Sequence, residues 1–438
     1  MAEFKRPASE KDFDVNFGQI KPLMNDTEAF YESARCLFCY DAPCVKSCPT
    51  SIDIPLFIRQ IHSDSPEFAA KTIYDSNVFG YACGKVCPTE ILCEGACVYN
   101  HSDVKPIEIG RLQTYATHKA IQSVKKMYSL KKSTGKKVAV IGAGPAGISC
   151  ACELSKEGIQ VDIYEASEKP SGLTIHGVAP YKITNEEVLS EMDYLQKQFK
   201  FNVLYENLIS TKSDVERLEK EYNAIFIGIG LGETSELFIP GENLINVFGA
   251  VEFVNDLRRL HHNVKVPNKI IVLGGGNTAM DAAGECARMG AEEVQLCYRR
   301  TKEEMGAYNF EFELVKRAGV KTVFSVSPIE IIGNSTVAGV KFANTKTENG
   351  VVTIIPDSEY IESCDWVIKA TGQSKKIELL NLLDIQMTNR GTIKVDEKFK
   401  TSREKYFSAG DAVSGGEEVV NAVANGKKSA RSIIELLA

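Results

Sequence analysis

The 438-residue chain lacks the features that would place it in a membrane or on a nucleic acid. No stretch approaches the roughly 20 consecutive apolar residues that a membrane-spanning helix needs. Positive charge is not in excess, since 51 lysines and arginines face 58 aspartates and glutamates. The net charge of -7 therefore gives no basis for proposing a nucleic acid or an anionic membrane as partner.

Two further absences bear on location and chemistry. Residues 1–14 are polar and contain no apolar signal segment, so we expect a cytoplasmic protein whose thiols stay reduced. The six histidines are scattered without metal-ligand spacing, and the pairs Cys150/Cys152 and Cys286/Cys297 do not form the Cys-x-x-Cys motif of redox disulfides. We therefore predict no catalytic acid, base or nucleophile.

Cysteine, by contrast, is abundant: eight of the 13 cysteines form two groups before residue 100. Their spacings are C-x2-C-x4-C-x3-C and C-x3-C-x5-C-x3-C, and Pro49 and Pro88 each directly follow a cysteine. This pattern is typical of iron–sulfur ligands, although its inner gaps differ from those of bacterial ferredoxins. Zinc sites and buried structural thiols are the alternatives. The groups are Cys36, Cys39, Cys44 and Cys48, then Cys83, Cys87, Cys93 and Cys97.

Residues 138–165 carry a dinucleotide-binding pattern. An apolar strand at 138–141 leads into Gly142-Ala-Gly-Pro-Ala-Gly147 and a helix, whose free N–H groups favour a phosphate. Gly142 allows the tight turn, Gly144 lets the backbone approach a pyrophosphate, and Gly147 lets the helix pack on the strand. A second strand at 161–165 ends in Glu165, which is placed to accept both hydroxyls of an unphosphorylated ribose.

A second part of this site is predicted near the C-terminus. The segment 406–411 ends an apolar strand with Gly410 and Asp411, which could bind the phosphates and a ribityl hydroxyl of FAD. The N-terminus of a helix at 417–426 would face the flavin and stabilise its reduced, negative form, although a plain packing helix is the alternative. The candidate residues of the site are Gly142, Gly144, Pro145, Ala146, Gly147, Glu165, Gly172, Leu173, Gly410, Asp411 and Val420.

The same pattern recurs with a different ending. The strand 270–273 leads into Gly274-Gly-Gly-Asn-Thr-Ala279 and a helix at 280–289, but the next strand, 293–298, ends in Arg299 and Arg300. A guanidinium there can bind a 2′-phosphate, so this site taken alone favours NADPH; arginines that stack on adenine or face water are the alternative. The candidates are Gly274, Gly276, Asn277, Thr278, Ala279, Arg299, Arg300 and Gly372.

With the motifs in this order, the whole chain resembles the amino-terminal half of dihydropyrimidine dehydrogenase. It looks closest to the bacterial NAD-dependent form, in which that half is a separate subunit. Glutamate synthase small subunits and the large subunit of ferredoxin–NADP transhydrogenase are similar but more distant. The resemblance is carried by residues 36–44, 48–50, 83–89, 106–113 and 226–231.

The resemblance divides the cysteines differently from their spacing. It implies one [4Fe-4S] cluster on three thiolates of the first group and the last of the second, and another on three thiolates and a glutamine on a helix begun at Pro106. Cys83 would be a bystander. A neutral oxygen ligand makes a cluster site less negative, which affects its potential. The implied ligands are Cys36, Cys39, Cys44 and Cys97 for the first cluster, and Cys48, Cys87, Cys93 and Gln113 for the second.

The predicted fold class is α + α/β, a helical iron–sulfur domain followed by two Rossmann-like domains of the disulfide-reductase type, the second inserted in the first. The boundaries are 1–125 for the cluster domain, 136–240 with 366–438 for the FAD domain, and 241–365 for the NAD(P)H domain, with residues 125–137 as a solvated linker.

The predicted activity is transfer of electrons from NADH to FAD and through two clusters to a partner FMN subunit that reduces uracil or thymine. The acidic stretch 301–308 and the closeness to the NAD-dependent form favour NADH, whereas the arginine pair favours NADPH. A glutamate synthase large subunit as partner, a ferredoxin–NADP transhydrogenase and a zinc-stapled binding module are the alternatives. A hetero-oligomer is expected.

Overall fold

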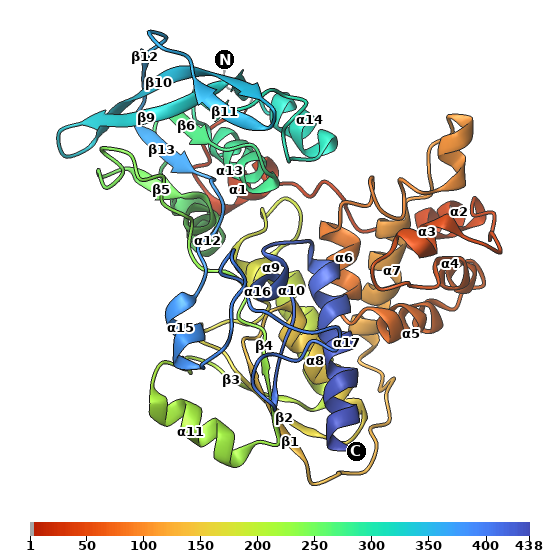
Figure 1. Ribbon diagram of the computed structural model, residues 1–438. Coiled ribbons are helices and arrows are strands. Elements are labelled where there is room, and N and C mark those ends of the chain that lie inside the picture. The colour runs from red at the N-terminus through yellow and green to blue at the C-terminus, as the bar shows by residue number, and fades with distance from the viewer. Residues whose placement is uncertain (1–3) are drawn as a thin grey trace. The chain divides into compact units, whose positions relative to one another are not determined.

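The computed structural model describes residues 4–438, which divide into two compact units (Figure 1). The larger unit contains residues 20–175, 182–231 and 375–438, and therefore most of the predicted cluster domain and most of the predicted FAD domain. The smaller unit contains residues 4–19, 176–181 and 232–374, with the predicted nicotinamide site. Within residues 4–438, no helix is both long and apolar enough to cross a membrane.

The first hundred residues of the larger unit form short helices joined by the cysteine-bearing loops. Helix α7 forms the core of this part, with Leu112 and Ala116 fully buried. It begins at Ile109 and not at Pro106 as predicted, and the backbone N–H of its N-cap residue Glu108 donates to the Glu32 carboxylate at 2.8 Å. The elements are α2 (Asp26–Ala34), α3 (Pro43–Ser47), α4 (Ile54–His62), α5 (Pro66–Ser76), α6 (Gly80–Val86), η1 (Val98–Ser102) and α7 (Ile109–Ser123).

The rest of the larger unit is a parallel sheet in the order β14-β4-β1-β2-β3. Its central strands are apolar and buried, as expected for a sheet with covered faces, and α8 and α17 pack against each other. The strands are β1 (Lys137–Ile141), β2 (Gln160–Tyr164), β3 (Asn202–Leu204), β4 (Ala224–Ile227) and β14 (Tyr406–Ser408). The helices are α8 (Pro145–Lys156), α10 (Asn185–Phe199), α11 (Lys212–Glu221), α15 (Ile377–Leu382), α16 (Asp411–Ser414) and α17 (Val419–Leu437), and α9 (Leu173–His176) runs into the smaller unit.

The smaller unit contains a second parallel sheet, in the order β5-β13-β6-β7-β8, and an antiparallel sheet that the sequence pattern did not predict. The parallel strands are β5 (Val247–Gly249), β6 (Lys269–Leu273), β7 (Glu293–Tyr298), β8 (Lys321–Phe324) and β13 (Trp366–Lys369). The antiparallel strands are β9 (Val326–Gly333), β10 (Val337–Glu348), β11 (Val351–Ile354) and β12 (Tyr360–Ser363). The helices are α1 (Glu10–Asn16), α12 (Ala250–Leu260), η2 (His261–Asn263), α13 (Asn277–Arg288) and α14 (Asn309–Arg317).

The segment 125–137 is not the solvated linker that its lysines predicted. Tyr128 is buried, its ring centroid lies 4.6 Å from that of Phe199, and its hydroxyl donates to Asp75 at 2.9 Å. The backbone N–H of Met127 donates to the side chain of Gln198 at 2.8 Å. The lysines face solvent, but the segment packs along α10 and α5 because one aromatic side chain has apolar surface to bury.

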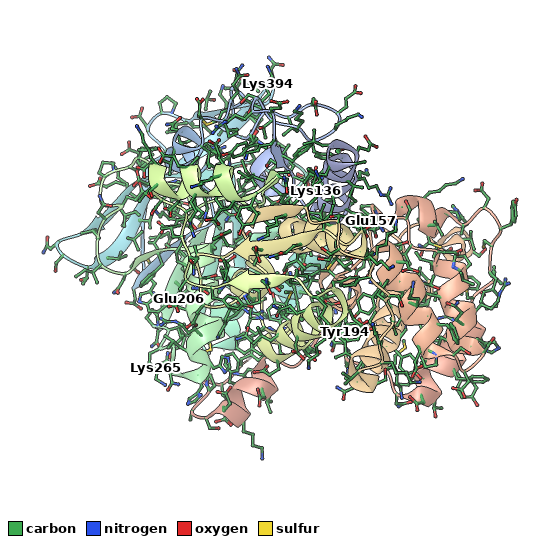
Figure 2. All side chains as sticks on the ribbon, turned by 90° about the horizontal axis from the view of Figure 1, so that it is seen from below. Lys136, Glu157, Tyr194, Glu206, Lys265 and Lys394 are labelled. Atoms are coloured by element: carbon green, nitrogen blue, oxygen red, sulfur yellow. The ribbon has the colours of Figure 1, made fainter. Side chains whose placement is uncertain are left out.

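The cluster helices are joined to the FAD-binding half by a buried carboxylate on α10. Glu191 accepts hydrogen bonds from the backbone N–H groups of Tyr81 at 2.6 Å and Ala82 at 3.0 Å, in the first turn of α6. On the same helix Tyr194, labelled in Figure 2, stacks with Tyr74 at a centroid distance of 5.4 Å. Burial raises the pKa of Glu191 to about 7. One side chain thereby supplies the cap that α6 lacks in its own sequence.

We expect this carboxylate to make stability depend on pH. In the unfolded chain Glu191 loses its proton near its ordinary pKa of 4.5, whereas in the folded protein it keeps it to about 7. The folded state therefore binds more protons between these pH values, and stability falls as pH rises through this range. Glu191→Gln resembles the neutral form, so its Tm should fall less between pH 5 and 7.5 than the wild-type Tm. The control is Glu186→Gln, an exposed position on α10; parallel Tm curves for Glu191→Gln and wild type would contradict the expectation.

Candidate cofactor sites

The first set of predicted cluster ligands meets in one cavity. Cys36 and Cys39 come from the loop between α2 and α3, Cys44 lies in α3, and Cys97 comes from the second cysteine group. All four line the cavity together with apolar side chains. Burial raises the pKa of Cys44 to about 12, so a thiolate there requires a nearby positive charge such as iron supplies. Four sulfurs around an apolar cavity fit the donor set of an iron–sulfur cluster. The apolar wall is made by residues that include Leu37, Ile54, Ile58, Ile107 and Ile109.

The second set lies around the C-terminal end of α6. Cys93 is close enough to Cys48 and Cys87 for their charges to raise its pKa further, after burial as the main cause. The Sγ of Cys48 is 3.2 Å from the hydroxyl of Thr50. Three sulfurs from three separate segments are thus gathered here, which fits the predicted thiolates. Among residues 4–438, no three histidine, cysteine or acidic side chains converge as a single metal ion would need.

Gln113, the predicted fourth ligand, is buried on α7. Its amide nitrogen donates to the backbone oxygen of Gly80 at 2.6 Å, which fixes the orientation of the amide at the start of α6. Cys83 lies one helical turn before Cys87, and a hydrogen bond between their side chains is the main cause that raises the pKa of Cys87, followed by burial. Cys83 therefore contacts a predicted ligand, and its role as a bystander stays a prediction.

The glycine turn after β1 has the geometry that a pyrophosphate site requires. A Cβ on Gly147 would lie 2.1 Å from the backbone oxygen of Gly142, so helix and strand can pack this closely only at glycine. A Cβ on Gly144 would meet only the oxygen of Gly228, at 3.8 Å, which leaves space beside the helix start for a ligand. The carboxylate of Glu165 accepts from the backbone N–H of Ala143 at 2.7 Å and is held at this turn. Pro145 and Ala146 are the first two residues of α8.

Two hydroxyl groups beside this turn have no hydrogen-bond partner within residues 4–438, although both are buried. They belong to Ser171 and Thr174, which flank the predicted residues Gly172 and Leu173. The backbone N–H of Ser171 donates to the oxygen of Ala143 at 2.7 Å, so this loop lies on the glycine turn. Buried hydroxyls without partners are costly, and a bound nucleotide would satisfy them. The residues present therefore fit FAD, whose flavin exchanges hydride with nicotinamide when bound.

The C-terminal part of this site lies at the end of β14. Gly410 has φ +74°, a conformation that favours glycine, and a Cβ there would lie 2.9 Å from the Cβ of Ala146. Burial raises the pKa of Asp411, and its carboxylate accepts from the N–H of Glu417 at 3.1 Å, just before α17 begins. Val420 is buried in the first turn of α17. The structure therefore brings Gly410 and Ala146 of the predicted FAD residues together.

The second glycine turn, after β6, repeats this geometry in the smaller unit. A Cβ on Gly274 would lie 2.4 Å from the oxygen of Ala370, whereas a Cβ on Gly276 would meet nothing within 4 Å. Asn277, Thr278 and Ala279 form the first turn of α13, and no side chain caps that turn. Open space in front of free helix N–H groups fits the pyrophosphate of a nicotinamide nucleotide. Gly372 has φ +98° and also has open space beside it.

The residues after β7 fold back on this turn. The N–H of Tyr308 donates to the Asn277 side chain at 3.0 Å, and the N–H of Ala307 donates to the oxygen of Gly275 at 2.9 Å. Arg299 is exposed, and within residues 4–438 the Nε of Arg300 is buried without a partner. The end of the acidic stretch therefore contacts the second glycine turn, and the role of the two arginines stays a prediction.

The sequence patterns missed four residues of these sites. Lys21 donates to the backbone oxygen of Cys87 at 3.0 Å, and the buried carboxylate of Glu94 accepts from the N–H of Gly110 at 2.9 Å. Ser171 and Thr174 are the other two. Serine and threonine beside Gly172 were a usable signal, because short polar residues around glycine are common in loops that bind nucleotides. Lys21 stands in an irregular segment with no motif around it.

Two family models match the chain in succession. Residues 14–125 match the model of dihydropyrimidine dehydrogenase domain II, 4Fe-4S cluster, and residues 136–426 match that of the pyridine nucleotide-disulphide oxidoreductases. The chain belongs to the pyridine nucleotide-disulphide oxidoreductase family. This oxidoreductase is NAD(P)H-dependent, with an FAD-binding domain and a 4Fe-4S domain for electron transfer. The predicted fold class and the predicted enzyme class are confirmed.

Curated relatives match the oxidoreductase over nearly its whole length. The NAD-dependent dihydropyrimidine dehydrogenase subunit PreT of Escherichia coli (strain K12) is 31% identical over 95% of this chain and 96% of its own. The glutamate synthase [NADPH] small chain of the same organism is 30% identical over 97% of this chain and 94% of its own. The predicted resemblance is confirmed, and relatives with two different printed activities share this architecture.

Solved structures share the fold of the two nucleotide-binding parts. FprA of Mycobacterium tuberculosis in complex with NADPH has a TM-score of 0.57 at 18% identity, over 69% of this chain and 84% of its own. Thioredoxin reductase of T. acidophilum has a TM-score of 0.55 at 20% identity, over 69% of this chain and 100% of its own. At these identities the likeness concerns the fold.

Gly276 provides a test of the nicotinamide site that leaves the fold intact. Its φ of −99° suits any residue and its surroundings are open, so Gly276→Ala should leave the Tm unchanged. The added methyl group would occupy the space for the pyrophosphate, and we expect the KM for the nicotinamide substrate to rise at least about tenfold, or about 1.4 kcal/mol. Steady-state dye reduction measures it. Gly284→Ala on α13, where a Cβ would lie 3.6 Å from the Tyr181 hydroxyl, is the control. An unchanged KM for Gly276→Ala would place the pyrophosphate elsewhere.

Proposed function

We propose that this oxidoreductase takes electrons from NADH on FAD and delivers them through two [4Fe-4S] clusters to a partner FMN subunit, which reduces uracil or thymine to the 5,6-dihydropyrimidine. The observation that carries the proposal is the cavity shared by Cys36, Cys39, Cys44 and Cys97. It supports the ligand division of the dihydropyrimidine dehydrogenase family, in which a thiolate of the second group joins the first. The relative PreT is named as a subunit, which supports a hetero-oligomer, and we propose a cytoplasmic location.

The chain's own residues serve to bind and orient the cofactors in this proposal. Hydride transfer between nicotinamide and flavin needs no acid or base from the protein. Glu165 is held at the first glycine turn where the ribose hydroxyls of FAD would bind, and Asp411 lies buried where a ribityl hydroxyl would bind. We propose the ligand sets and the domain boundaries 1–125, 136–240 with 366–438, and 241–365 as predicted.

We propose NADH as the donor, although Arg299 and Arg300 follow β7. The end of the acidic stretch contacts the glycine turn, since the N–H of Ala307 donates to the oxygen of Gly275. The Glu304 carboxylate accepts from the N–H of Thr301 at 3.2 Å, just after β7, where it disfavours the further negative charge of a 2′-phosphate. The likeness to a subunit named NAD-dependent supports the same donor.

A second candidate keeps every cofactor and changes the partner. The glutamate synthase small chain of Escherichia coli matches almost as well as PreT, so a glutamate synthase large subunit could receive the electrons. The partner's product distinguishes the two.

The cysteine assignment predicts different effects for two cysteines one helical turn apart. Cys87→Ser should lose one cluster, about half of the iron and sulfide, because a predicted ligand is removed. Cys83→Ser should keep the full iron content, because its hydroxyl replaces a hydrogen bond to Cys87 and no ligand is lost. Anaerobic purification followed by iron, sulfide and flavin assays measures both. Equal iron loss in the two variants would make Cys83 a ligand, and zinc in place of iron in the wild type would overturn the cluster proposal.

The whole function is tested by purifying the chain with the subunit that binds it and supplying NADH under anaerobic conditions. We expect NADH to bleach the flavin at least about tenfold faster than NADPH, and the complex to convert uracil to dihydrouracil. Arg300→Ala should leave the NADH rate unchanged, since no 2′-phosphate is bound. Formation of glutamate from 2-oxoglutarate and glutamine, with no dihydrouracil, would establish the second candidate instead.

A further inference from the structure

A lysine from an irregular segment reaches the second cysteine set of the larger unit. Lys21 lies between α1 and α2, and its side chain is 13% exposed. Its ammonium donates to the backbone oxygen of Cys87 at 3.0 Å and to the hydroxyl of Thr89 at 2.8 Å. Glu90 lies 3.7 Å away. A mostly buried ammonium with two neutral acceptors and one partly exposed carboxylate is held there at a cost in desolvation.

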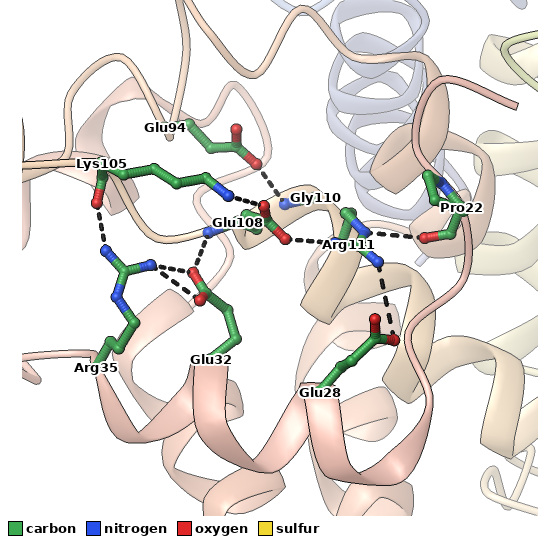
Figure 3. A network of polar contacts seen from close by, with 9 residues as sticks. All are labelled: Pro22, Glu28, Glu32, Arg35, Glu94, Lys105, Glu108, Gly110 and Arg111. Atoms are coloured by element: carbon green, nitrogen blue, oxygen red, sulfur yellow. Dashed lines mark hydrogen bonds and ion pairs between the residues drawn. The ribbon is translucent and has the colours of Figure 1, made fainter.

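The residues that follow Lys21 hold it in place. The carbonyl oxygen of Pro22 accepts from the side chain of Arg111 at 2.9 Å, and Arg111 also pairs with Glu108 at 2.6 Å, as Figure 3 shows. Met24 is buried two residues further on. The segment is therefore anchored to α7 without the lysine. A neutral residue at position 21 should leave the segment in place.

Both positive and negative groups surround the second set of cysteines. Burial raises the pKa of Cys93. The hydrogen bond with Cys83, followed by burial, raises the pKa of Cys87. The positive charge of Lys21 opposes both shifts. Glu94 is a buried carboxyl whose own pKa is raised by burial, and Glu418 acts on Cys87 from the start of α17. The charge of Lys21 thus acts on the sulfurs of Cys87 and Cys93 and on the Glu94 carboxyl.

We propose that the Lys21 ammonium sets the reduction potential of the cluster held by Cys48, Cys87, Cys93 and Gln113. This inference rests on the proposed ligand set. A cluster held by these residues would gain one negative charge on reduction, and a fixed cation nearby would stabilise that charge. Cluster potentials depend on net charge, so Lys21 raises this potential. The neutral glutamine ligand acts in the same direction.

Arg59 on α4 is an exposed cation near the first set of cysteines. Its guanidinium lies 4.9 Å from the ring centroid of Phe38 and acts as a cation on Cys36. The two sites therefore each have a basic side chain from outside the cysteine motifs, and exchange of either one should alter one cluster and spare the other.

Anaerobic potentiometric titration followed by electron paramagnetic resonance tests the proposal on the full-length holoprotein. Lys21→Gln keeps a hydrogen-bond donor but removes the charge, and we expect it to lower the midpoint potential of one cluster signal. Lys21→Arg should leave that potential near the wild-type value. Arg59→Gln, the matched control, should lower the potential of the other signal. Iron and sulfide are measured for every variant.

Unchanged potentials in Lys21→Gln with full iron would overturn the proposal, as would equal shifts in the Gln and Arg variants, which would show a role in holding the segment. If Lys21→Gln loses iron, Glu90→Gln is measured instead: removal of that carboxylate should raise the same potential, and no rise would overturn the proposal. Wild-type protein without iron and sulfide would mark failure of the proposed function itself.

Discussion

The hydrogen bonds from Tyr81 and Ala82 to Glu191 determine where the cysteine-bearing helix α6 lies. A helix start inside a protein must have partners for its N–H groups, and α6 obtains them from α10, on the FAD-binding half. The Gln113 amide is bound to Gly80 at that same helix start. One buried carboxylate therefore fixes the position of the predicted glutamine ligand and, at the other end of α6, that of Cys87, relative to the flavin-binding sheet.

The two nucleotide sites show how one local pattern serves two ligands. In both, a buried strand leads into a glycine turn in which some positions leave no room for a Cβ, and an uncapped helix start faces open space. The difference lies at the end of the following strand, where Glu165 is held by backbone N–H groups at one site and Arg299 is left exposed at the other. We propose that the shared geometry binds the pyrophosphate and that the residue at the strand end selects the ribose.

The elements that could be predicted from sequence are those with a strict local pattern. Strands β1, β6 and β7 lie within a residue of their predicted positions because apolar runs beside glycine turns have few other structures available. The antiparallel sheet was not predicted because its strands, such as β11, are exposed in an irregular pattern. Lys21 and Tyr128 could not be foreseen, since their contacts join residues far apart in the chain. The place of Cys97 came from the resemblance alone, because spacing groups it with its sequence neighbours.

The crossing of Cys97 into the first cavity has a consequence for how the protein matures. A chain that has left the ribosome only as far as the first cysteine group has three of the four sulfurs of one cavity and a single sulfur of the other. Neither site is complete until the second group has been made, and the glutamine on α7 follows later still. The cysteines must therefore stay reduced and free of metal during synthesis. Both cluster sites become ready for metal insertion at nearly the same time.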